Sequence, residues 1–479
     1  MAEEKTEDKG GDKSDKPVER PEKQVVTQHS AVIAGGEVDY TVTVETVNLK
    51  DDKGEDRASI FAVSYVRDAA DTQRPVTFCF NGGPGSSAVW LHFGAFGPKR
   101  VDIPDLVTVK PPPHTLIDNP EGLFDLSDLV FIDPVGTGFS RPAGEKKIDA
   151  YTGVKEDIES VGEFIWRWLS RNGRWNSPKF IAGESYGTTR CGGLANWLQE
   201  KGIALNGVVL VSLATNFQTF VAETGNDLPH VLYLPTFALV ASYHGVIPQV
   251  DLDEVKRFAV EDYAPALMKG DRLPDEDRDA LAEQLAAYTG LPAGQIARRQ
   301  LRIPYLWFAR NLLELPDHTV GRMDGRYIGP DSDPYAQSMA RDPAIDAVWP
   351  SFTAVANDTL RRVYGFESDE LYQVLNMDVN KAWRWSQEGR LGFINTNEDL
   401  RAAIVANPHL RVIVCNGVYD LATPMFAASY SIDTLGLPQD RRGNVSVEFY
   451  EAGHMMYFHP PSLAKLRADL ESFYAKALG

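Results

Sequence analysis

The sequence predicts an α/β fold, with a central, mostly parallel sheet that has helices on both faces. Short apolar runs end in glycine-rich or acidic loops, as at Val76 to Phe80 and Leu129 to Asp133. Strands that are apolar on both faces are what a parallel sheet between helices requires. Four more runs follow this pattern: Phe180 to Gly183, Val208 to Leu213, Arg411 to Asn416 and Val445 to Tyr450. Between the runs, apolar residues recur at helical spacing, at Val154, Ile158, Val161, Ile165 and Trp168.

The two ends of the chain differ from this pattern. Residues 1–24 are rich in charged residues and glycine and almost free of apolar side chains, so we expect a disordered tail of mixed acidic and basic charge. From Val25 onward, alternation over Val38 to Glu45 after Gly35-Gly36 predicts an antiparallel hairpin. The stretch Ile60 to Val66 continues it. Near the C-terminus, Pro460-Pro461 opens a predicted amphipathic helix.

Residues 217–410 interrupt the alternation of strands and helices. Their pattern is mostly helical, with candidates at Leu281 to Tyr288, Phe352 to Val363 and Leu371 to Trp385, broken by clusters of Pro, Gly and Asp. We interpret them as a mainly helical cap insertion that roofs the active site. The α/β core then consists of residues 25–216 and 411–479.

Composition excludes several classes of partner. The 479 residues, 43% hydrophobic, suffice for one large core with an insertion. The net charge of −19 argues against nucleic-acid and anionic-membrane partners, because both present phosphate. No run approaches the ~18 apolar residues of a membrane helix, and the N-terminus is too charged for a signal peptide. The sequence as given predicts a cytoplasmic protein; a periplasmic or secreted one would follow if a signal peptide had been trimmed. The oligomeric state is left open.

The three cysteines indicate neither a disulfide framework nor a metal site. Cys79, Cys191 and Cys415 contain no C-x-x-C pair and lie in or beside apolar stretches. We expect buried free thiols. No metal and no organic cofactor is implied.

A nucleophile motif follows one of the predicted strands. Gly183-Glu184-Ser185-Tyr186-Gly187 matches G-x-S-x-G, comes directly after the apolar run Lys179 to Ala182 and precedes a predicted helix over Thr188 to Glu200. A strand, a tight turn and a helix present the Ser hydroxyl above the sheet, as in the α/β-hydrolase fold. Ser185 is therefore the predicted nucleophile of a serine hydrolase.

A glycine loop follows an earlier strand, at Asn81-Gly82-Gly83-Pro84-Gly85-Ser86-Ser87. Acyl transfer needs two backbone N–H groups directed at the tetrahedral oxygen, and such a loop supplies one of them. The residue after the nucleophile supplies the other, so we assign the oxyanion hole to Gly83 and Tyr186. A phosphate-binding loop is disfavoured because neither G-x-G-x-x-G nor a Walker Gly-Lys-Ser/Thr is present.

The partners of the nucleophile lie farther along the chain, in the order Ser, Asp, His that this fold uses. Asp420 follows the strand that ends at Cys415, and His454 follows the strand Val445 to Tyr450. His459 is the nearest rival but leads directly into Pro460-Pro461. We predict that His454 takes the Ser185 proton as general base and that Asp420 orients it.

These motifs together resemble the serine carboxypeptidase family. The resemblance spans about Pro75 to Phe458 except the cap, and rests on Asn81-Gly-Gly-Pro-Gly, Phe96-Gly-Pro98, Asp133-Pro-Val-Gly-Thr-Gly-Phe-Ser140, Gly183-Glu-Ser-Tyr-Gly187, Gly417-Val-Tyr-Asp420 and Gly453-His-Met455. It implies removal of single C-terminal residues from peptides through an acyl-enzyme. It also implies that Asn81 and Glu184 bind the terminal carboxylate of the substrate, with Met455 as a further substrate-binding residue.

The sequence departs from the family pattern at three positions. Two carboxylates in contact repel unless one is protonated, so Glu184 needs a raised pKa or an acidic working pH. The family pairs this acid with a second Glu, and here that position is Ala95, which puts the acid-pH behaviour of the family in doubt. Ser86 and Thr423 stand where members carry disulfide or pocket cysteines. The chain thus resembles a bacterial-type, disulfide-free branch.

Two alternatives to a carboxypeptidase are an esterase or acyltransferase with the same triad, acting on small esters, and a non-catalytic binding protein on a hydrolase scaffold. The presence of Ser185, Asp420 and His454 together argues against the second. The cap also contains a charged turn, Gly321-Arg-Met-Asp-Gly-Arg326. We expect this turn to be held by its own ion pairs rather than to contact substrate.

Overall fold

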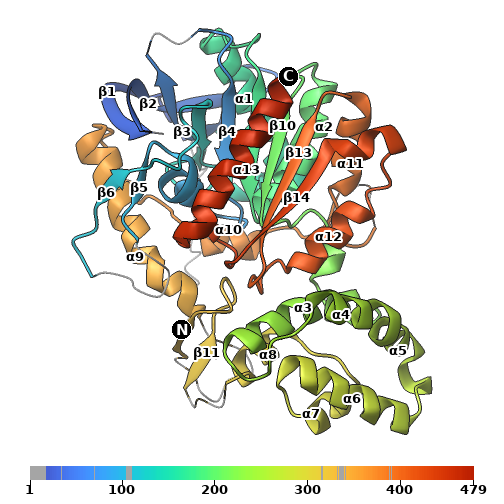
Figure 1. The fold of residues 1–479 in the computed structure, drawn as a ribbon. Coiled ribbons are helices and arrows are strands. Elements are labelled where there is room, and N and C mark those ends of the chain that lie inside the picture. The colour runs from blue at the N-terminus through green and yellow to red at the C-terminus, as the bar shows by residue number, and fades with distance from the viewer. Residues whose placement is uncertain are drawn as a thin grey trace, which may run out of the picture.

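The computed structural model of the chain describes residues 18–33, 35–68, 71–103, 111–313, 315, 317–331, 333, 339, 341–387, 389 and 391–479. Within them, a ten-stranded sheet forms the centre of the molecule (Figure 1). The sheet order is β1-β2-β3-β7-β4-β9-β10-β13-β14, with β8 paired to β3. Its strands are β1 (Gln24–Ile33), β2 (Gly36–Lys50), β3 (Asp56–Arg67), β4 (Val76–Phe80), β7 (Asp128–Ile132), β8 (Arg141–Pro142), β9 (Lys179–Glu184), β10 (Gly207–Val211), β13 (Arg411–Gly417) and β14 (Val445–Tyr450). Two short pairs stand apart, β5 (Lys99–Val101) with β6 (Leu116–Asp118) and β11 (His318–Val320) with β12 (Ile328–Pro330).

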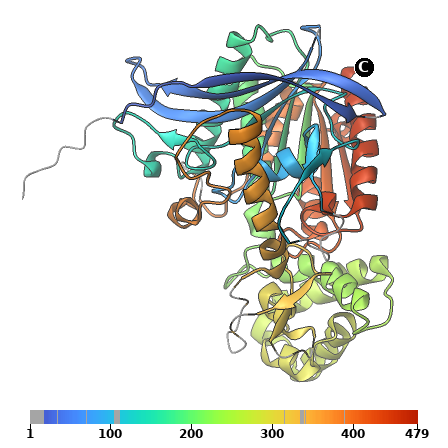
Figure 2. The ribbon, with the colours of Figure 1, turned by 90° about the vertical axis from the view of Figure 1, so that its left-hand side faces the viewer.

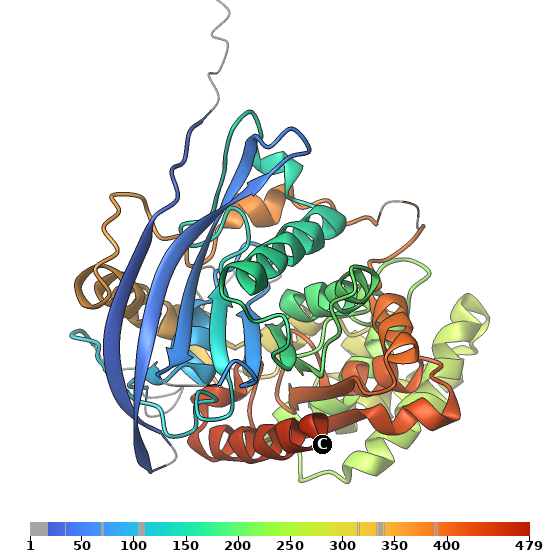
Figure 3. The ribbon, with the colours of Figure 1, turned by 90° about the horizontal axis from the view of Figure 1, so that it is seen from above.

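The sheet is antiparallel at its N-terminal edge and parallel elsewhere. Strands β1, β2 and β3 form the predicted hairpin and its continuation, and β3 joins β7 antiparallel. From β7 through β4, β9, β10 and β13 to β14, all neighbours are parallel. Seen from above, the long strands β1 to β3 lie at one side of the molecule (Figure 3). The predicted mostly parallel α/β sheet is confirmed.

Helices cover both faces of the sheet, as the side chains of the strands require. In β10, Val208 and Leu210 belong to one hydrophobic cluster, and Val209 and Val211 belong to the other, because successive side chains of a strand point to opposite faces. Helices α1 (Val154–Arg171), α2 (Tyr186–Glu200) and α11 (Asn397–Ala406) pack on the first face. Helices α9 (Pro343–Asp358) and α13 (Pro460–Leu478) pack on the other.

A helical lobe lies below one end of the sheet (Figures 1 and 2). It has its own hydrophobic cluster and contains α3 (Leu228–Tyr243), α4 (Leu252–Phe258), α5 (Ala264–Lys269), α6 (Asp275–Thr289), α7 (Ala293–Arg298) and α8 (Tyr305–Asn311). It meets the core where α3 packs against α12 (Met425–Asp433). Within the proposed insertion 217–410, therefore, α3 to α8 form a separate body, whereas α9 and α11 pack on the sheet itself.

Two stretches differ from the sequence prediction. Residues 1–17 of the predicted tail lie outside the described part of the chain, but residues 18–24 pack on the core: the Arg20 guanidinium pairs with Glu370 at 2.7 Å, and Arg171 pairs with Glu22 at 2.8 Å. Long-range ion pairs order this charged segment, and composition does not reveal them.

The predicted helix over residues 371–385 is also wrong for most of its length. Only α10 (Met377–Ala382) is helical there. The backbone before it pairs with two loops: a bridge joins Leu375 to Ser86 of the glycine loop, and another joins Gln373 to Gly138 in the loop after β7. The buried loops need these hydrogen-bond partners, and local sequence pattern cannot show that need.

No helix in the described ranges is both long and apolar enough to cross a membrane.

Helix α1 offers a direct test of the core. Trp168 is 1% exposed, meets the ring of Phe78 edge-on at 5.3 Å and donates to Ser64 at 3.0 Å. Trp168→Ala should lower the free energy of unfolding by about 3–5 kcal/mol because it leaves a cavity. Trp166 on the same helix is 45% exposed, so Trp166→Ala should change it by about 0.5 kcal/mol or less. Urea denaturation measures both, and equal losses would contradict this packing.

Candidate active site

Ser185 occupies a sharp turn between β9 and α2. The backbone φ of Ser185 is 59°, in the positive-φ region that residues other than glycine rarely adopt. The Ser185 N–H donates to the carbonyl of Val211 on the neighbouring strand at 2.9 Å, which fixes the turn to the sheet. The predicted strand, turn and helix are therefore present, and the side chain of Ser185 retains some accessible surface. This is the geometry in which a hydroxyl is presented at the edge of a sheet.

Asp420 and His454 are in direct contact. Asp420 Oδ2 lies 2.7 Å from His454 Nδ1, and both residues are buried. The other acceptor sites of the carboxylate are also occupied. Oδ1 accepts from the N–H groups of Ala422 and Thr423 at 2.7 and 2.9 Å, and Oδ2 accepts from the Thr423 hydroxyl at 2.7 Å. A carboxylate held at so many points can fix the orientation and tautomer of an imidazole.

The backbone of His454 is fixed from two directions. The Ser212 hydroxyl, at the end of β10, donates to the His454 carbonyl at 2.6 Å. From the other side, the His454 N–H donates to the carbonyl of Met323 at 2.6 Å, and the Gly453 N–H donates to Asp324 Oδ2 at 3.0 Å. Met323 and Asp324 belong to the charged turn 321–326 that joins β11 to β12. The imidazole is thus positioned by the sheet and by this turn together.

Ser185 and His454 lie at the same edge of the sheet, but no hydrogen bond joins their side chains. His454 Nε2 is buried and has no partner among the described residues. Buried polar atoms without partners are rare and call for an explanation. Hydrogen bonds between a nucleophile and its base are often long in unliganded enzymes. The Nε2 atom is therefore available to take a proton from Ser185 or to give one to a leaving group.

The glycine loop lies against the start of α2. A Cβ on Gly82 would come within 2.4 Å of the Tyr186 nitrogen, so only glycine allows this approach. Gly83 has a φ of +100°. Neither the Gly83 N–H nor the Tyr186 N–H donates a hydrogen bond to another residue of the described part of the chain. The structure thus brings the two predicted oxyanion-hole groups into adjacent segments with both N–H groups available.

A buried arginine ties the glycine loop to the helices. The guanidinium of Arg190 on α2 is paired with Asp157 on α1 at 2.8 and 3.1 Å, and its third contact is to the carbonyl of Asn81 at 2.7 Å. It also lies over the rings of Phe80 and Tyr186. Arg190 is 1% exposed. This ion pair holds the loop against the turn that carries Ser185.

Asn81 and Glu184 form a second polar group beside Ser185. Asn81 Oδ1 accepts from the Leu91 N–H at 3.1 Å, which leaves Asn81 Nδ2 buried and without a described partner. Glu184 Oε2 accepts from the Tyr457 hydroxyl at 2.8 Å. An unpaired amide N–H2 next to a buried carboxyl group is suited to bind an oxygen-bearing ligand group.

The protonation states of this site are set by burial and by neighbouring charges. Burial and the charge of Asp420 raise the pKa of Glu184 to about 7, against the opposing effects of the His454 cation and of the Tyr457 and Asn81 side chains. For His454, burial alone lowers the pKa, but the charge of Asp420 and the hydrogen bond to it raise the pKa above its ordinary value. At neutral pH, Glu184 is therefore partly protonated and can donate a hydrogen bond.

Sequence reasoning missed Tyr457 and Arg190. The ring of Tyr457 packs against Gly94, where an added Cβ would come within 2.7 Å of it. Gly94 is followed by the buried Ala95, which stands in place of the second Glu of the family. Tyr457 thus supplies Glu184 with a hydrogen-bond partner there. The sequence signal for Tyr457 is its position three residues after the predicted general base, His454. Met455 lies directly after His454 and is partly buried against the core.

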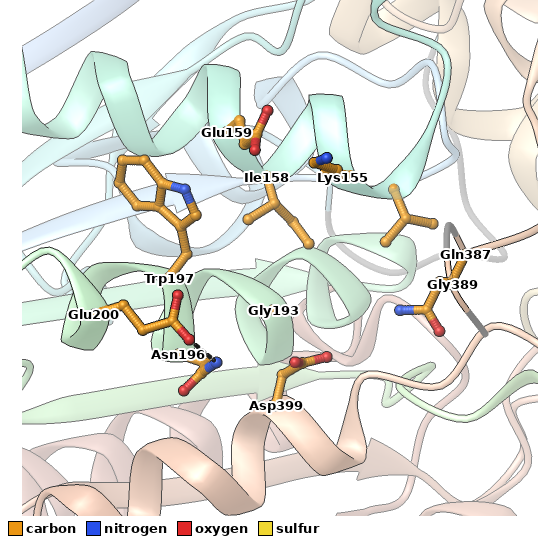
Figure 4. Close-up of a pocket in the computed structure, with 11 residues that line it drawn as sticks. Lys155, Ile158, Glu159, Gly193, Asn196, Trp197, Glu200, Gln387, Gly389 and Asp399 are labelled. Atoms are coloured by element: carbon orange, nitrogen blue, oxygen red, sulfur yellow. Dashed lines mark hydrogen bonds between the residues drawn. The ribbon is translucent and has the colours of Figure 1, made fainter.

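Two of the pockets differ in their position relative to the candidate site residues. One lies between α1 and α2 (Figure 4), where Lys155 and Glu159 face Trp197 and Glu200. None of the candidate site residues lines it, so it is not the candidate active site. The other is apolar and is lined by Phe217, Val221, Glu223, Trp385, Gly392, Phe393 and Ile394. The ring centroids of Phe217 and Trp385 lie 6.4 and 6.3 Å from that of Tyr186, so this pocket adjoins the side chain of Tyr186.

The described residues contain no group of three or more His, Cys, Asp and Glu side chains placed to hold a metal ion.

Comparison with known proteins relates this site to one family. A family model described as serine carboxypeptidase matches residues 48–289, which include Asn81, Gly83 and Ser185. Serine carboxypeptidase-like 36 of Arabidopsis thaliana is 27% identical over 193 residues, 39% of this chain and 35% of that protein. Serine carboxypeptidase ctsa-3.2 of Caenorhabditis elegans is 26% identical over 201 residues, 40% of this chain and 34% of that protein. The match thus spans about a third of the length of these curated relatives.

Among solved structures, the fold is similar to that of Kex1Δp, a prohormone-processing carboxypeptidase from Saccharomyces cerevisiae. The TM-score is 0.58 with 14% sequence identity, and the alignment covers 91% of each chain. This likeness supports the α/β-hydrolase fold.

The Asp157–Arg190 pair gives a prediction for the oxyanion loop. Replacing both residues by apolar ones of similar size, Asp157→Leu with Arg190→Met, should keep the free energy of unfolding within about 2 kcal/mol. It should slow fluorophosphonate labelling of Ser185 by about tenfold to a hundredfold, because the loop loses its anchor at Asn81. Asp157→Leu alone leaves a buried unpaired cation and should cost about 3–5 kcal/mol of stability. A double variant that labels at the wild-type rate would show that the pair is structural only.

Proposed function

Because this chain belongs to the serine carboxypeptidase family, we propose that it hydrolyses C-terminal residues from peptides through an acyl-enzyme intermediate on Ser185. The observation that carries this proposal is the group beside Ser185, where Asn81 Nδ2 is buried and unpaired and Glu184 has a pKa near 7. Together they offer two hydrogen-bond donors to a terminal carboxylate.

The proposed reaction uses the site residues in two steps. His454 Nε2 takes the proton of the Ser185 hydroxyl as its oxygen attacks the scissile carbonyl, and the negative oxygen that forms is held by the N–H groups of Gly83 and Tyr186. His454 then gives its proton to the leaving amine, and the C–N bond breaks. In the second step water gives a proton to His454 and attacks the acyl-enzyme. The acyl–oxygen bond then breaks, His454 returns the proton to the Ser185 oxygen, and the shortened peptide leaves.

Recognition of the substrate carboxylate depends on the protonated form of Glu184. An ionised Glu184 would repel the terminal carboxylate, whereas the neutral acid donates a hydrogen bond to it. Tyr457 already occupies Oε2 with its own hydroxyl, so Oε1 is the oxygen left for the proton and the substrate. We propose that the Tyr457 hydroxyl takes the place of the absent second acid as the hydrogen-bond partner of Glu184, without adding a negative charge.

An esterase or acyltransferase activity with the same triad is the second candidate. Ala95 in place of a second acid leaves a single carboxyl group for carboxylate recognition, which favours weaker selection of free C-termini. Turnover of small esters without cleavage of peptides would support it, and product analysis with added alcohol acceptors would separate transfer from hydrolysis.

We also propose that the protein works in a reducing compartment, the cytoplasm. Its three cysteines, Cys79, Cys191 and Cys415, are all free and buried. This use of cysteine fits a chain whose stability does not depend on disulfide bonds.

The carboxylate preference can be measured on matched substrates. A blocked dipeptide with a free C-terminus should be hydrolysed at least about tenfold faster than its C-terminal amide, because each charge-assisted hydrogen bond lost costs about 1.5–3 kcal/mol. Asn81→Ala should reduce this ratio, and Ser185→Ala should abolish both reactions. Equal kcat/KM values for acid and amide in the wild-type protein would refute carboxylate recognition.

The pH dependence provides a separate test. As pH rises through about 7, Glu184 loses its proton, so the ratio of kcat/KM for free acid over amide should fall. The Tyr457 hydroxyl lowers the pKa of Glu184, so Tyr457→Phe should move this fall to higher pH. Tyr474→Phe is a matched control, since that buried tyrosine bonds to Thr77 instead. A ratio that stays constant across neutral pH would contradict the role of Glu184.

A further inference from the structure

The turn 321–326 carries two arginines in opposite situations. Arg326 is fully engaged: it pairs with Asp324 at 2.7 Å, donates to the carbonyl of Glu451 at 2.8 Å and lies over the ring of Tyr419. This is the ion pair expected from the sequence. Arg322 makes no hydrogen bond and no ion pair through its side chain with any described residue, and its Nε atom is buried without a partner. The prediction for this turn is thus confirmed for Arg326 and wrong for Arg322.

The backbone of Arg322 is fixed between the loops of Asp420 and His454. Its carbonyl accepts from the Leu421 N–H at 3.0 Å, and the next residue, Met323, accepts from the His454 N–H at 2.6 Å. On the other side of the turn, the Gly325 N–H donates to the carbonyl of Tyr419 at 2.9 Å. The guanidinium is therefore delivered to the neighbourhood of the candidate triad by a rigid turn, not by a mobile loop.

Four ionisable side chains lie near enough to Arg322 to change the pKa of its guanidinium: Tyr305, Asp342, Tyr233 and Asp420. Burial alone lowers the pKa of Arg322, but these neighbours raise it above its usual value, so the group stays charged. The rings of Tyr233 and Tyr305 are stacked on each other at 5.3 Å. The cation is close enough to His454 to oppose protonation of the imidazole. The charge of Arg322 thus acts within the candidate active site.

Neither Asp420 nor Asp342 forms a hydrogen bond or an ion pair with the Arg322 guanidinium. Both oxygens of Asp420 accept hydrogen bonds from its own loop and from His454. Asp342 Oδ1 accepts from the Ala344 N–H at 3.0 Å, and Oδ2 accepts from the Met323 N–H at 2.9 Å. A guanidinium with a buried, unsatisfied Nε is costly unless an anion completes it. No side chain of the described residues makes this contact with Arg322 Nε, so a ligand carboxylate can supply it.

We propose that Arg322 binds a carboxylate of the peptide substrate, in addition to the group formed by Asn81 and Glu184. The planar fork of a guanidinium matches a carboxylate through two parallel hydrogen bonds. In a protein of net charge −19, a local cation also offsets the repulsion that an acidic substrate meets on approach. The carboxylate is either an acidic side chain on one of the two residues flanking the scissile bond or the C-terminus itself. This proposal rests on the proposed peptidase function.

The test compares ratios of rates within each variant. The substrates are blocked dipeptides with Glu or Gln at each of the two residues that flank the scissile bond, prepared both as free acids and as C-terminal amides. The value of kcat/KM is measured for wild type, Arg322→Met, Arg322→Lys and the control Arg362→Met. Arg362 is an exposed arginine paired with Asp358. In wild type and control, Glu should be favoured over Gln at one position by about tenfold or more. Arg322→Met should remove that preference, and Arg322→Lys should restore part of it, since Lys keeps the charge without the fork.

The outcomes identify the source of the carboxylate. Loss of the Glu-over-Gln ratio in Arg322→Met assigns the site to a substrate side chain, and loss of the acid-over-amide ratio assigns it to the C-terminus. Both ratios unchanged in Arg322→Met would overturn the proposal. Ratios within one variant do not depend on the fraction of folded enzyme, so a partly unfolded variant still gives an answer.

A binding experiment separates this proposal from the peptidase function. Calorimetry measures the affinity of the Ser185→Ala protein for the Glu and Gln dipeptides, with and without Arg322→Met. Glu-dependent or acid-dependent binding that vanishes in Arg322→Met supports the site even if the wild-type protein cleaves no peptide, a result that would defeat the proposed function alone. Binding that is indifferent to Arg322, in a protein that does cleave peptides, would defeat the site and leave the proposed function standing.

Discussion

The alignment of three parallel strands fixes where Glu184, Ser185 and the loop of Asp420 lie. Glu184 at the end of β9 pairs with Val211 at the end of β10, and Val211 pairs with Cys415 of β13, two residues before β13 ends at Gly417. The next residues, including Ser185 and the loop that leads to Asp420, must leave the sheet at the same edge. A shift by one residue in either pair would turn the side chains to the opposite face. The chemistry of the site therefore depends on the hydrogen-bond register of the sheet.

The polar groups around the site fall into two classes. The carboxylate of Asp420 and the guanidinium of Arg190 have their hydrogen-bonding positions occupied by protein groups, and both act on neighbouring segments rather than on a ligand. Asn81 Nδ2, His454 Nε2 and Arg322 Nε are buried and unpaired. Folded proteins rarely leave such atoms unpaired, so the contrast supports the proposal that the first two groups build the site and that the last three contact a substrate.

Sequence alone predicted those features that local pattern determines. The strands, the turn at Ser185, the hairpin and helix α1 follow from periodicity and from glycine positions, and the order of Ser185, Asp420 and His454 follows from the fold. Tyr457 and Arg322 could not be assigned, because their roles depend on contacts with Glu184 and with the Asp420 loop, both distant in sequence. The stretch 371–385 has helical periodicity, yet the residues before α10 pair with the glycine loop and with the loop that contains Gly138. The need of buried backbone groups for hydrogen-bond partners outweighs local helix propensity there.

The hydrogen bond from His454 to Met323 has a thermodynamic consequence for the whole molecule. Met323 belongs to the β11–β12 hairpin, which lies between the helical lobe and α9 in the sequence. The position of the imidazole is therefore coupled to the position of this hairpin against the core. An interaction that favours this position of the hairpin therefore favours the observed position of the imidazole, and a ligand that binds the imidazole stabilises the hairpin by the same coupling free energy. Because β11 packs against α8, this coupling reaches the helical lobe.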